Sequence, residues 1–273
     1  MGASLPLDVE QRGQGPPLVF LHGFGASRFT FRAWADDLAG ANELHLIDLF
    51  GCGAAPPPAD GRYGPVEQAE VVTRYLCESD LRGVTLIGHS LGGGVAMLAA
   101  HRLHELGQAD RLVGLVSVAG PAYAQAIPRY IALAQLPLLG ALLLRAVGPD
   151  RVVRAVLRSI FFDADCVTGV QVEGYAAPMR NPGTRDAVIA TARQIVPDRL
   201  DDLVAGFGDI GTPTLLLWGR HDHVIPLWVG KRLAHEMQRA RLVVLERCGH
   251  APPEECPQES LAAVRKFLVE IGA

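Results

Sequence analysis

The residue that is best placed to do chemistry is a serine with a glycine two positions before it and another two positions after it. Ser90 lies at the centre of GHSLG, residues 88–92, after an apolar run and before a helical pattern. In that context a G-x-S-x-G sequence displays a nucleophile on a sharp strand-to-helix turn, and the small residues leave room for neighbouring chain. A serine hydroxyl attacks a carbonyl near neutral pH only with the help of a base. Ser90 therefore predicts a base elsewhere in the chain.

Two later loops offer a base and an acid. Asp222 follows the predicted strand 214–218, and His250 follows the predicted strand 242–246. The carboxyl ends of parallel strands lie at the same edge of a sheet, and the loop that carries Ser90 also begins at this edge. The chain order Ser90, Asp222, His250 is that of one known triad geometry. We expect Ser90 as nucleophile, His250 as general base and Asp222 as the acid that orients the histidine.

A metal site in the loop around Asp222 is an alternative, because His221 and His223 flank it. An extended loop does not bring these three side chains to one side. We expect no metal and no cofactor.

The developing negative charge on a substrate oxygen needs hydrogen-bond donors, which are often backbone N–H groups. Leu91 N–H lies at the start of the predicted helix after Ser90, where it can face an anion. The loop HGFG, residues 22–25, follows the predicted strand 17–21 and offers Phe24 N–H. We expect Leu91 and Phe24 to form the oxyanion hole.

The elements that position these residues alternate between strands and helices. Short apolar runs separated by helical patterns are typical of a mostly parallel sheet with helices on both faces. The predicted strands are 17–21, 44–48, 84–88, 112–119, 214–218 and 242–246, with 5–10 as an antiparallel edge. The predicted helices are 31–38, 66–78, 91–106, 230–238 and 260–271. The expected fold class is therefore α/β.

The alternation stops between residues 120 and 211, where only helix-compatible segments separated by prolines occur. We interpret residues 121–205 as an inserted helical cap on a core formed by residues 1–120 and 206–273. Residues 127–144 are apolar on nearly every face, so they pack on the core, line a pocket, or contact a membrane or partner. The pocket hypothesis assigns its lining to His22, His89, Leu139, Leu143, Phe161 and Phe162.

Composition excludes several function classes. The 273 residues are 49% hydrophobic and 20% charged, with a formal net charge of -4. Scattered basic residues give no footprint for nucleic acid. The five cysteines form no C-x-x-C pair, and the first residues lack the basic and apolar regions of a signal peptide. We expect a cytoplasmic protein with reduced thiols, a small-molecule substrate and no stable membrane insertion. The pattern assigns no oligomeric state.

These motifs together resemble the α/β-hydrolase family along the whole chain outside the cap. HGFG at 22–25 is similar to its oxyanion loop, GHSLGG at 88–93 to its nucleophile elbow, GRHD at 219–222 to its acid loop, and GHAP at 249–252 with Glu255 and Pro257 to its histidine loop. DLFGCG at 48–53 is similar to the family's D-x-x-G-x-G turn, with Ala55 where many members have serine.

The resemblance implies hydrolysis of a carboxylic ester, thioester or lactone, and the apolar residues 127–144 favour a small hydrophobic substrate. A serine nucleophile argues against the members that attack with aspartate. Hydrolases of carbon-carbon bonds in ring-cleavage products are an alternative, although those often have asparagine and tryptophan where this chain has His89 and Ala251. A ligand receptor without catalytic activity on the same fold is the other alternative, because fold likeness does not settle function.

Overall fold

A single sheet organises the computed structural model, which describes residues 5–136 and 147–273. Its seven strands have the order β1-β3-β2-β4-β5-β6-β7. β1 pairs with β3 antiparallel, and all other neighbours are parallel. The strands are β1 (Asp8–Arg12), β2 (Pro17–Leu21), β3 (Glu43–Asp48), β4 (Val84–His89), β5 (Leu112–Val118), β6 (Thr214–Gly219) and β7 (Ala240–Leu245). The mostly parallel α/β sheet predicted from the sequence is confirmed.

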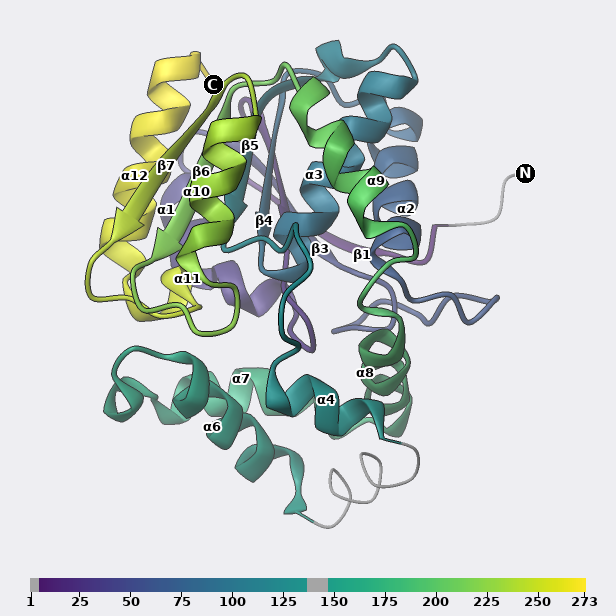
Figure 1. Ribbon diagram of the computed structural model, residues 1–273, viewed down its shortest axis with the longest axis vertical. Helices are drawn as coiled ribbons and strands as arrows, with labels where there is room; N and C mark the ends of the chain where they lie inside the picture. Colours follow the sequence, from purple (N-terminus) through teal and green to yellow (C-terminus); the bar gives the residue numbers. More distant parts are fainter. Residues whose placement is uncertain (1–4, 137–146) are drawn as a thin grey trace.

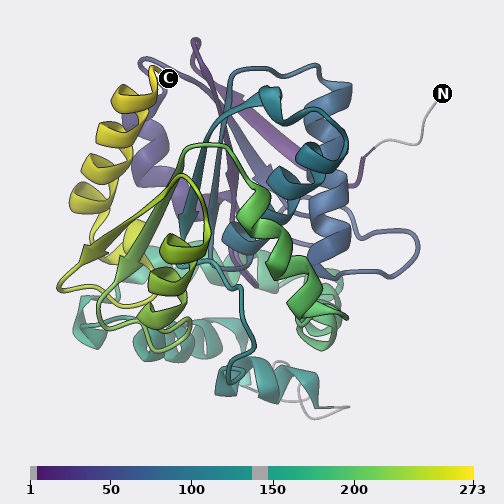
Figure 2. The same cartoon turned by 45° about the horizontal axis from the view of Figure 1, so that its top comes forward.

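Helices cover both faces of the sheet (Figures 1 and 2). Successive side chains of β2 enter different cores: Val19 and Leu21 pack in one, Leu18 and Phe20 in the other. This alternation follows from the two-residue period of a strand. The first core is covered by α2 (Pro65–Glu78), α3 (Leu91–Glu105) and α10 (Leu227–Glu236), and the second by α1 (Arg32–Leu38) and α12 (Pro257–Ile271). Burial on both faces explains why the strands are apolar almost throughout.

Element ends differ from the predicted ranges by a few residues. α10 begins at Leu227 rather than at 230, directly after Pro226, and α12 begins at Pro257 rather than at 260. Proline has a fixed φ that suits the start of a helix. The edge strand is Asp8–Arg12 rather than residues 5–10. A one-turn helix, α11 (Pro252–Glu255), precedes α12.

Between β5 and β6, the described residues form helices and no strand. They are α4 (Arg129–Gln135), α6 (Pro149–Ile160), α7 (Gly169–Met179), α8 (Pro182–Gln194) and α9 (Leu200–Ala205). In Figure 1, α4, α6, α7 and α8 lie below the carboxyl ends of the strands, whereas α9 runs beside α3. Short 3-10 helices are Arg28–Phe31, Ala109–Arg111, Ala164–Cys166 and Gly206–Asp209. The division into a cap of residues 121–205 and a core stays a prediction. In the described part of the chain, no helix has the length and apolar character to span a membrane.

Candidate active site

The turn between β4 and α3 holds Ser90 in a strained backbone conformation. Its φ of 52° and ψ of -122° are outside the regions that ordinary residues occupy. A Cβ at Gly88 would collide with the Gly92 carbonyl, and one at Gly92 would collide with the Leu21 carbonyl. Ser90 N–H donates to the Val118 carbonyl at 2.8 Å, which fixes the turn to β5. Strain held in place by its surroundings is typical of functional sites.

Ser90, His250 and Asp222 form one hydrogen-bonded series. Ser90 Oγ lies 2.8 Å from His250 Nε2, and His250 Nδ1 lies 2.9 Å from Asp222 Oδ2. His250 is 2% exposed and Asp222 5%. Because a carboxylate only accepts, Nδ1 carries the imidazole proton and Nε2 accepts the Ser90 hydroxyl proton. The loops after β4, β6 and β7 meet at one edge of the sheet, as the sequence predicted.

The second oxygen of Asp222 is also occupied. Asp222 Oδ1 accepts the backbone N–H groups of Val224 and Ile225, each at 2.8 Å. The carboxylate is therefore held on both sides, which leaves Oδ2 in a fixed position for the histidine.

Glu255 and the end of α6 hold the backbone around His250. Glu255 accepts N–H groups from Gly249 at 2.9 Å, Ala251 at 2.8 Å and Phe162 at 2.6 Å. His250 N–H donates to the Ile160 carbonyl at 2.9 Å. Burial raises the pKa of Glu255, and the three N–H groups oppose that rise. The histidine loop is thus tied to the helical segment between β5 and β6.

The HGFG loop is oriented by His22. Leu49 N–H donates to His22 Nε2 at 3.0 Å, so the ring proton is on Nδ1, which donates to the Gly23 carbonyl at 2.8 Å. Burial lowers the pKa of His22, which favours this neutral form. In a trans peptide the C=O and N–H point in opposite directions, so Phe24 N–H is directed away from the His22 ring. Leu91 is the first residue of α3, where the helix itself provides no acceptor for its N–H.

His89 supports the histidine loop from below. His89 Nε2–H donates to the His250 carbonyl at 2.9 Å. Burial, followed by the nearby His250, lowers the pKa of His89 to about 3. His89 is therefore a neutral donor at ordinary pH.

A cavity of about 670 Å³ opens over Ser90. Its floor is formed by core residues that include Phe24, His89, Ser90 and His250. Its walls come from α4, α6, α7 and α8, and most of these side chains are apolar, with Leu133, Val152, Val153, Val156 and Val188 among them. A mostly apolar cavity with a few placed polar groups is typical of a small-molecule site.

Several residues predicted to line the pocket lie elsewhere. Phe161 packs in a cluster with Leu157, Val172 and Ala251. Phe162 is 42% exposed, and the centroid of its ring lies 4.5 Å from that of His221. Both follow the end of α6, whose docking on the histidine loop turns them away from the cavity. The His22 side chain contacts Leu49 N–H and the Gly23 carbonyl and does not line the cavity. Leu139 and Leu143 fall outside the described residues. Of the predicted set in the described part, only His89 lines the cavity.

The sequence contained a signal for the wall that was missed. In α6, the apolar residues Val152, Val153, Val156, Leu157 and Ile160 recur at helical spacing, while Arg154 and Arg158 lie between them. Such a stripe predicts one buried helix face. Tyr175 and Thr30 also line the cavity, but no apolar periodicity marks them. Their positions are set by a buried polar network, whose members come from distant parts of the sequence.

That network is centred on Glu254, whose side chain is 1% exposed. Arg32 Nη2 donates to Glu254 Oε2 at 2.7 Å, Gln171 Nε2 to the same oxygen at 2.9 Å, and Tyr175 OH to Oε1 at 2.7 Å. Tyr175 OH also lies 3.1 Å from Thr30 Oγ1. The network joins α1 and α11 to α7, and so fixes one wall of the cavity.

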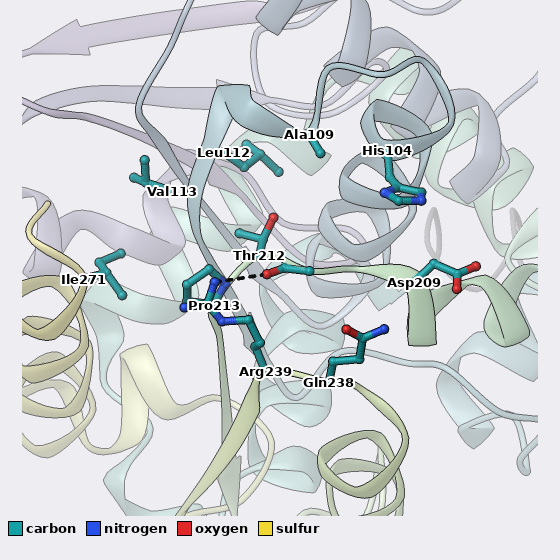
Figure 3. Close-up of a pocket in the computed structure, with 11 residues that line it drawn as sticks. His104, Ala109, Leu112, Val113, Asp209, Thr212, Pro213, Gln238, Arg239 and Ile271 are labelled. Carbon is teal, nitrogen blue, oxygen red and sulfur yellow. Dashed lines mark hydrogen bonds between the residues drawn. The ribbon is translucent and has the colours of Figure 1, made fainter.

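A second cavity of about 700 Å³ lies near the amino ends of β5 and β6 (Figure 3). It is lined by residues before and at the starts of β5 and β6, with His104, Asp209 and Arg239 around it, and Arg239 donates to the Gly211 carbonyl at 3.4 Å. The Ser90 series lies at the carboxyl ends of the strands, so this cavity is separate from it. Within residues 5–136 and 147–273, no group of His, Cys, Asp and Glu side chains is arranged to hold a metal.

Comparisons with known proteins find relatives along nearly the whole chain. A sequence model of the alpha/beta hydrolase family matches residues 18–264. The chain is 27% identical to a 2-hydroxymuconate semialdehyde hydrolase of Pseudomonas putida, over 100% of this chain and 94% of that protein. It is 28% identical to a pimeloyl-(acyl-carrier protein) methyl ester esterase of Aeromonas salmonicida, over 97% of this chain and 100% of that protein.

Solved structures give the same fold. A thermophilic esterase from Thermogutta terrifontis superposes with a TM-score of 0.79 at 23% identity, over 98% of this chain and 94% of that chain.

Proposed function

We propose that this chain, which belongs to the alpha/beta hydrolase family, is a serine hydrolase that cleaves a carboxylic ester, thioester or lactone of a small hydrophobic substrate. One observation carries the proposal: Ser90, His250 and Asp222 are hydrogen-bonded in series at the floor of a largely apolar cavity. Similarity to an esterase along the whole chain supports this bond class.

In the proposed acylation, Ser90 Oγ attacks the substrate carbonyl carbon while His250 Nε2 takes the hydroxyl proton. The carbonyl oxygen becomes an oxyanion that accepts the N–H groups of Leu91 and Phe24, and Asp222 stabilises the imidazolium. The bond to the leaving group then breaks, and His250 Nε2 gives its proton to the departing oxygen or sulfur. The product of this half-reaction is an acyl ester on Ser90.

In the proposed deacylation, His250 Nε2 takes a proton from water as its oxygen attacks the acyl carbon. The same two N–H groups accept the second oxyanion. Collapse of this intermediate breaks the bond to Ser90 Oγ, which receives the proton from His250. The acid product leaves through the cavity. The chain's own residues supply every proton transfer in this cycle.

Hydrolysis of a carbon-carbon bond in a ring-cleavage product is the second candidate. The observation that favours it is the similarity to a 2-hydroxymuconate semialdehyde hydrolase over the full chain. Offering that compound beside simple aryl esters distinguishes the two candidates. A higher kcat/KM on the ring-cleavage product would favour carbon-carbon hydrolysis.

The test of ester hydrolysis uses aryl esters of graded acyl length with wild type and Ser90→Ala. We expect the variant to lose at least ~10³ of kcat/KM, because no acyl-enzyme can form. A fluorophosphonate probe should label Ser90 alone. Ser79→Ala, at the exposed end of α2, is the matched control. Full activity in Ser90→Ala would refute the proposal, and tight saturable binding without turnover in wild type would favour a receptor.

A further inference from the structure

We propose that the substrate carries a carboxylate on the part remote from the scissile bond, and that Arg151 binds it with the help of the positive charge of Arg129 on the same cavity wall. The inference rests on the proposed function: it keeps the reaction and an apolar part of the substrate in the same cavity, and it adds a charged group at the end remote from the scissile bond. It is carried by the charge of the cavity wall, by the ion pairs of Arg158 and Arg180, and by the position of Arg151 on α6.

The described wall of the cavity has cationic side chains and no anionic ones. Arg129, in the first turn of α4, and Arg151, in the first turn of α6, both line it together with Ser90. No Asp or Glu is among the described lining residues. A site walled by one sign of charge raises the local concentration of oppositely charged ligands.

Neither arginine forms an ion pair within the described part of the chain, whereas Arg158 and Arg180 do. Arg158 of α6 pairs with Asp165 at 3.0 Å, and Arg180 engages Asp150 at 2.9 Å, the carboxylate next to Arg151 in sequence. Residues 1–4 and 137–146, which are not described, contain no Asp or Glu. No carboxylate side chain from those segments is therefore available to neutralise Arg129 or Arg151.

Along α6, Arg151 lies at one end of the helix, and the residue that contacts the backbone of His250 lies at the other. The Ile160 carbonyl accepts His250 N–H, and Arg151 lies nine residues earlier, which is about 14 Å along a helix. Val152, Val153 and Val156 line the wall between them. In Figure 1, α6 begins away from the core and ends nearer to it. This order fits a substrate with an ester at one end, an apolar middle and a carboxylate at the other.

Guanidinium groups recognise carboxylates through paired N–H donors, which an ammonium does not reproduce. Both arginines are exposed, so the attraction is partly screened by solvent and salt. The two charges together should change selectivity by about tenfold.

The test compares aryl monoesters of straight-chain dicarboxylic acids with the same esters whose remote carboxylate is capped by a methyl group. The measured quantity is the ratio of kcat/KM for the free carboxylate to kcat/KM for the capped ester. In wild type we expect this ratio to pass through a maximum as the chain lengthens. At that length the double variant Arg129→Gln/Arg151→Gln should lower the ratio about tenfold, and the corresponding lysine variant should lie between. Added salt should lower the wild-type ratio.

Arg154→Gln is the matched control, because Arg154 is exposed on the same helix but does not line the cavity. It should leave the ratio unchanged. An unchanged ratio in the double variant, or an equal fall in Arg154→Gln, overturns the inference. If wild type hydrolyses neither ester, the proposed function fails, and the inference is then decided by binding. The free diacid should raise the melting temperature of wild type but not of the double variant, and equal shifts would overturn it.

Discussion

Replacing Glu255 by glutamine tests whether the backbone around His250 must be held for catalysis. The change is nearly isosteric, and it removes one acceptor oxygen from a group that receives three N–H donors. Glu255 Oε2 accepts from Gly249 and Phe162, and Oε1 accepts from Ala251. The amide oxygen of glutamine should therefore face the pair of donors, which places its NH₂ against Ala251 N–H.

The magnitude follows from those contacts. One buried donor loses its acceptor, at about 1–3 kcal/mol, and two charge-assisted bonds become neutral ones, at about 1 kcal/mol each. The lower cost of burying a neutral amide offsets part of this, so the free energy of unfolding should fall by roughly 2–4 kcal/mol. Displacement of a catalytic group by ~1 Å lowers rates by ~10². We expect kcat of Glu255→Gln to fall ~10- to 100-fold, while KM changes much less.

The assay is steady-state hydrolysis of an aryl ester over a range of pH, with melting temperature measured in parallel. Burial raises the pKa of Glu255, so wild type should protonate this carboxyl on the acidic side and lose an acceptor there as well. The ratio of wild-type to variant kcat should therefore shrink as pH falls. Glu259→Gln, an exposed position on α12, is the control. A variant with a lower melting temperature but a kcat within about twofold of wild type would refute the positioning role.

Three further predictions concern Asp222, the Arg32–Glu254 contact and His89. Asp222→Asn should lower kcat by up to ~10⁴, as measured by steady-state kinetics. The N–H groups of Val224 and Ile225 fix the amide oxygen at the Oδ1 position, so the NH₂ group faces His250 and forces the wrong tautomer. An unchanged kcat would mean that another acid orients the histidine. Arg32→Met should lower the free energy of unfolding by about 2–4 kcal/mol by leaving a buried carboxylate, and adding Glu254→Gln should restore part of it, whereas strictly additive denaturation midpoints would contradict the coupling. In the folded protein His89 has a pKa of about 3. Below pH ~6.5 the unfolded chain therefore binds a proton that the folded chain does not. As the pH is lowered from neutral to about 5, the free energy of unfolding should fall by about 2 kcal/mol. His89→Gln should flatten this fall in denaturation curves, and an unchanged slope would exclude His89 as its source.

The sheet and the placement of Ser90, Asp222 and His250 could be predicted because their signals are local. A strand buried on both faces must be apolar throughout, so β2, β4 and β6 stand out in the sequence. The turn at Ser90 requires small neighbours, which Gly88 and Gly92 provide. Parallel strand order then brings Asp222 and His250 to the same edge, so their proximity needed no knowledge of side-chain packing.

The walls of the cavity could not be predicted in the same way, since they depend on how helices dock. Phe161 and Phe162 were expected to face Ser90 because they are large and apolar. In the structure the first fills a separate cluster and the second stacks on His221. Their direction is set by where α6 ends, and that end is fixed by contacts with a loop about 90 residues later in the chain.

Those contacts are also the reason why the link between α6 and His250 leaves little trace in the sequence. Ile160 contributes a carbonyl and Phe162 an N–H, so any residue other than proline at 162 could make the same bonds. A sequence motif consists of residue types, and a hydrogen bond made by backbone atoms does not require a particular residue type. Gly249 is the exception, because a Cβ there would collide with the Ile160 carbonyl. The glycine before His250 is therefore required by the approach of α6 to the histidine loop, and at this position the junction restricts the residue type to one without a side chain.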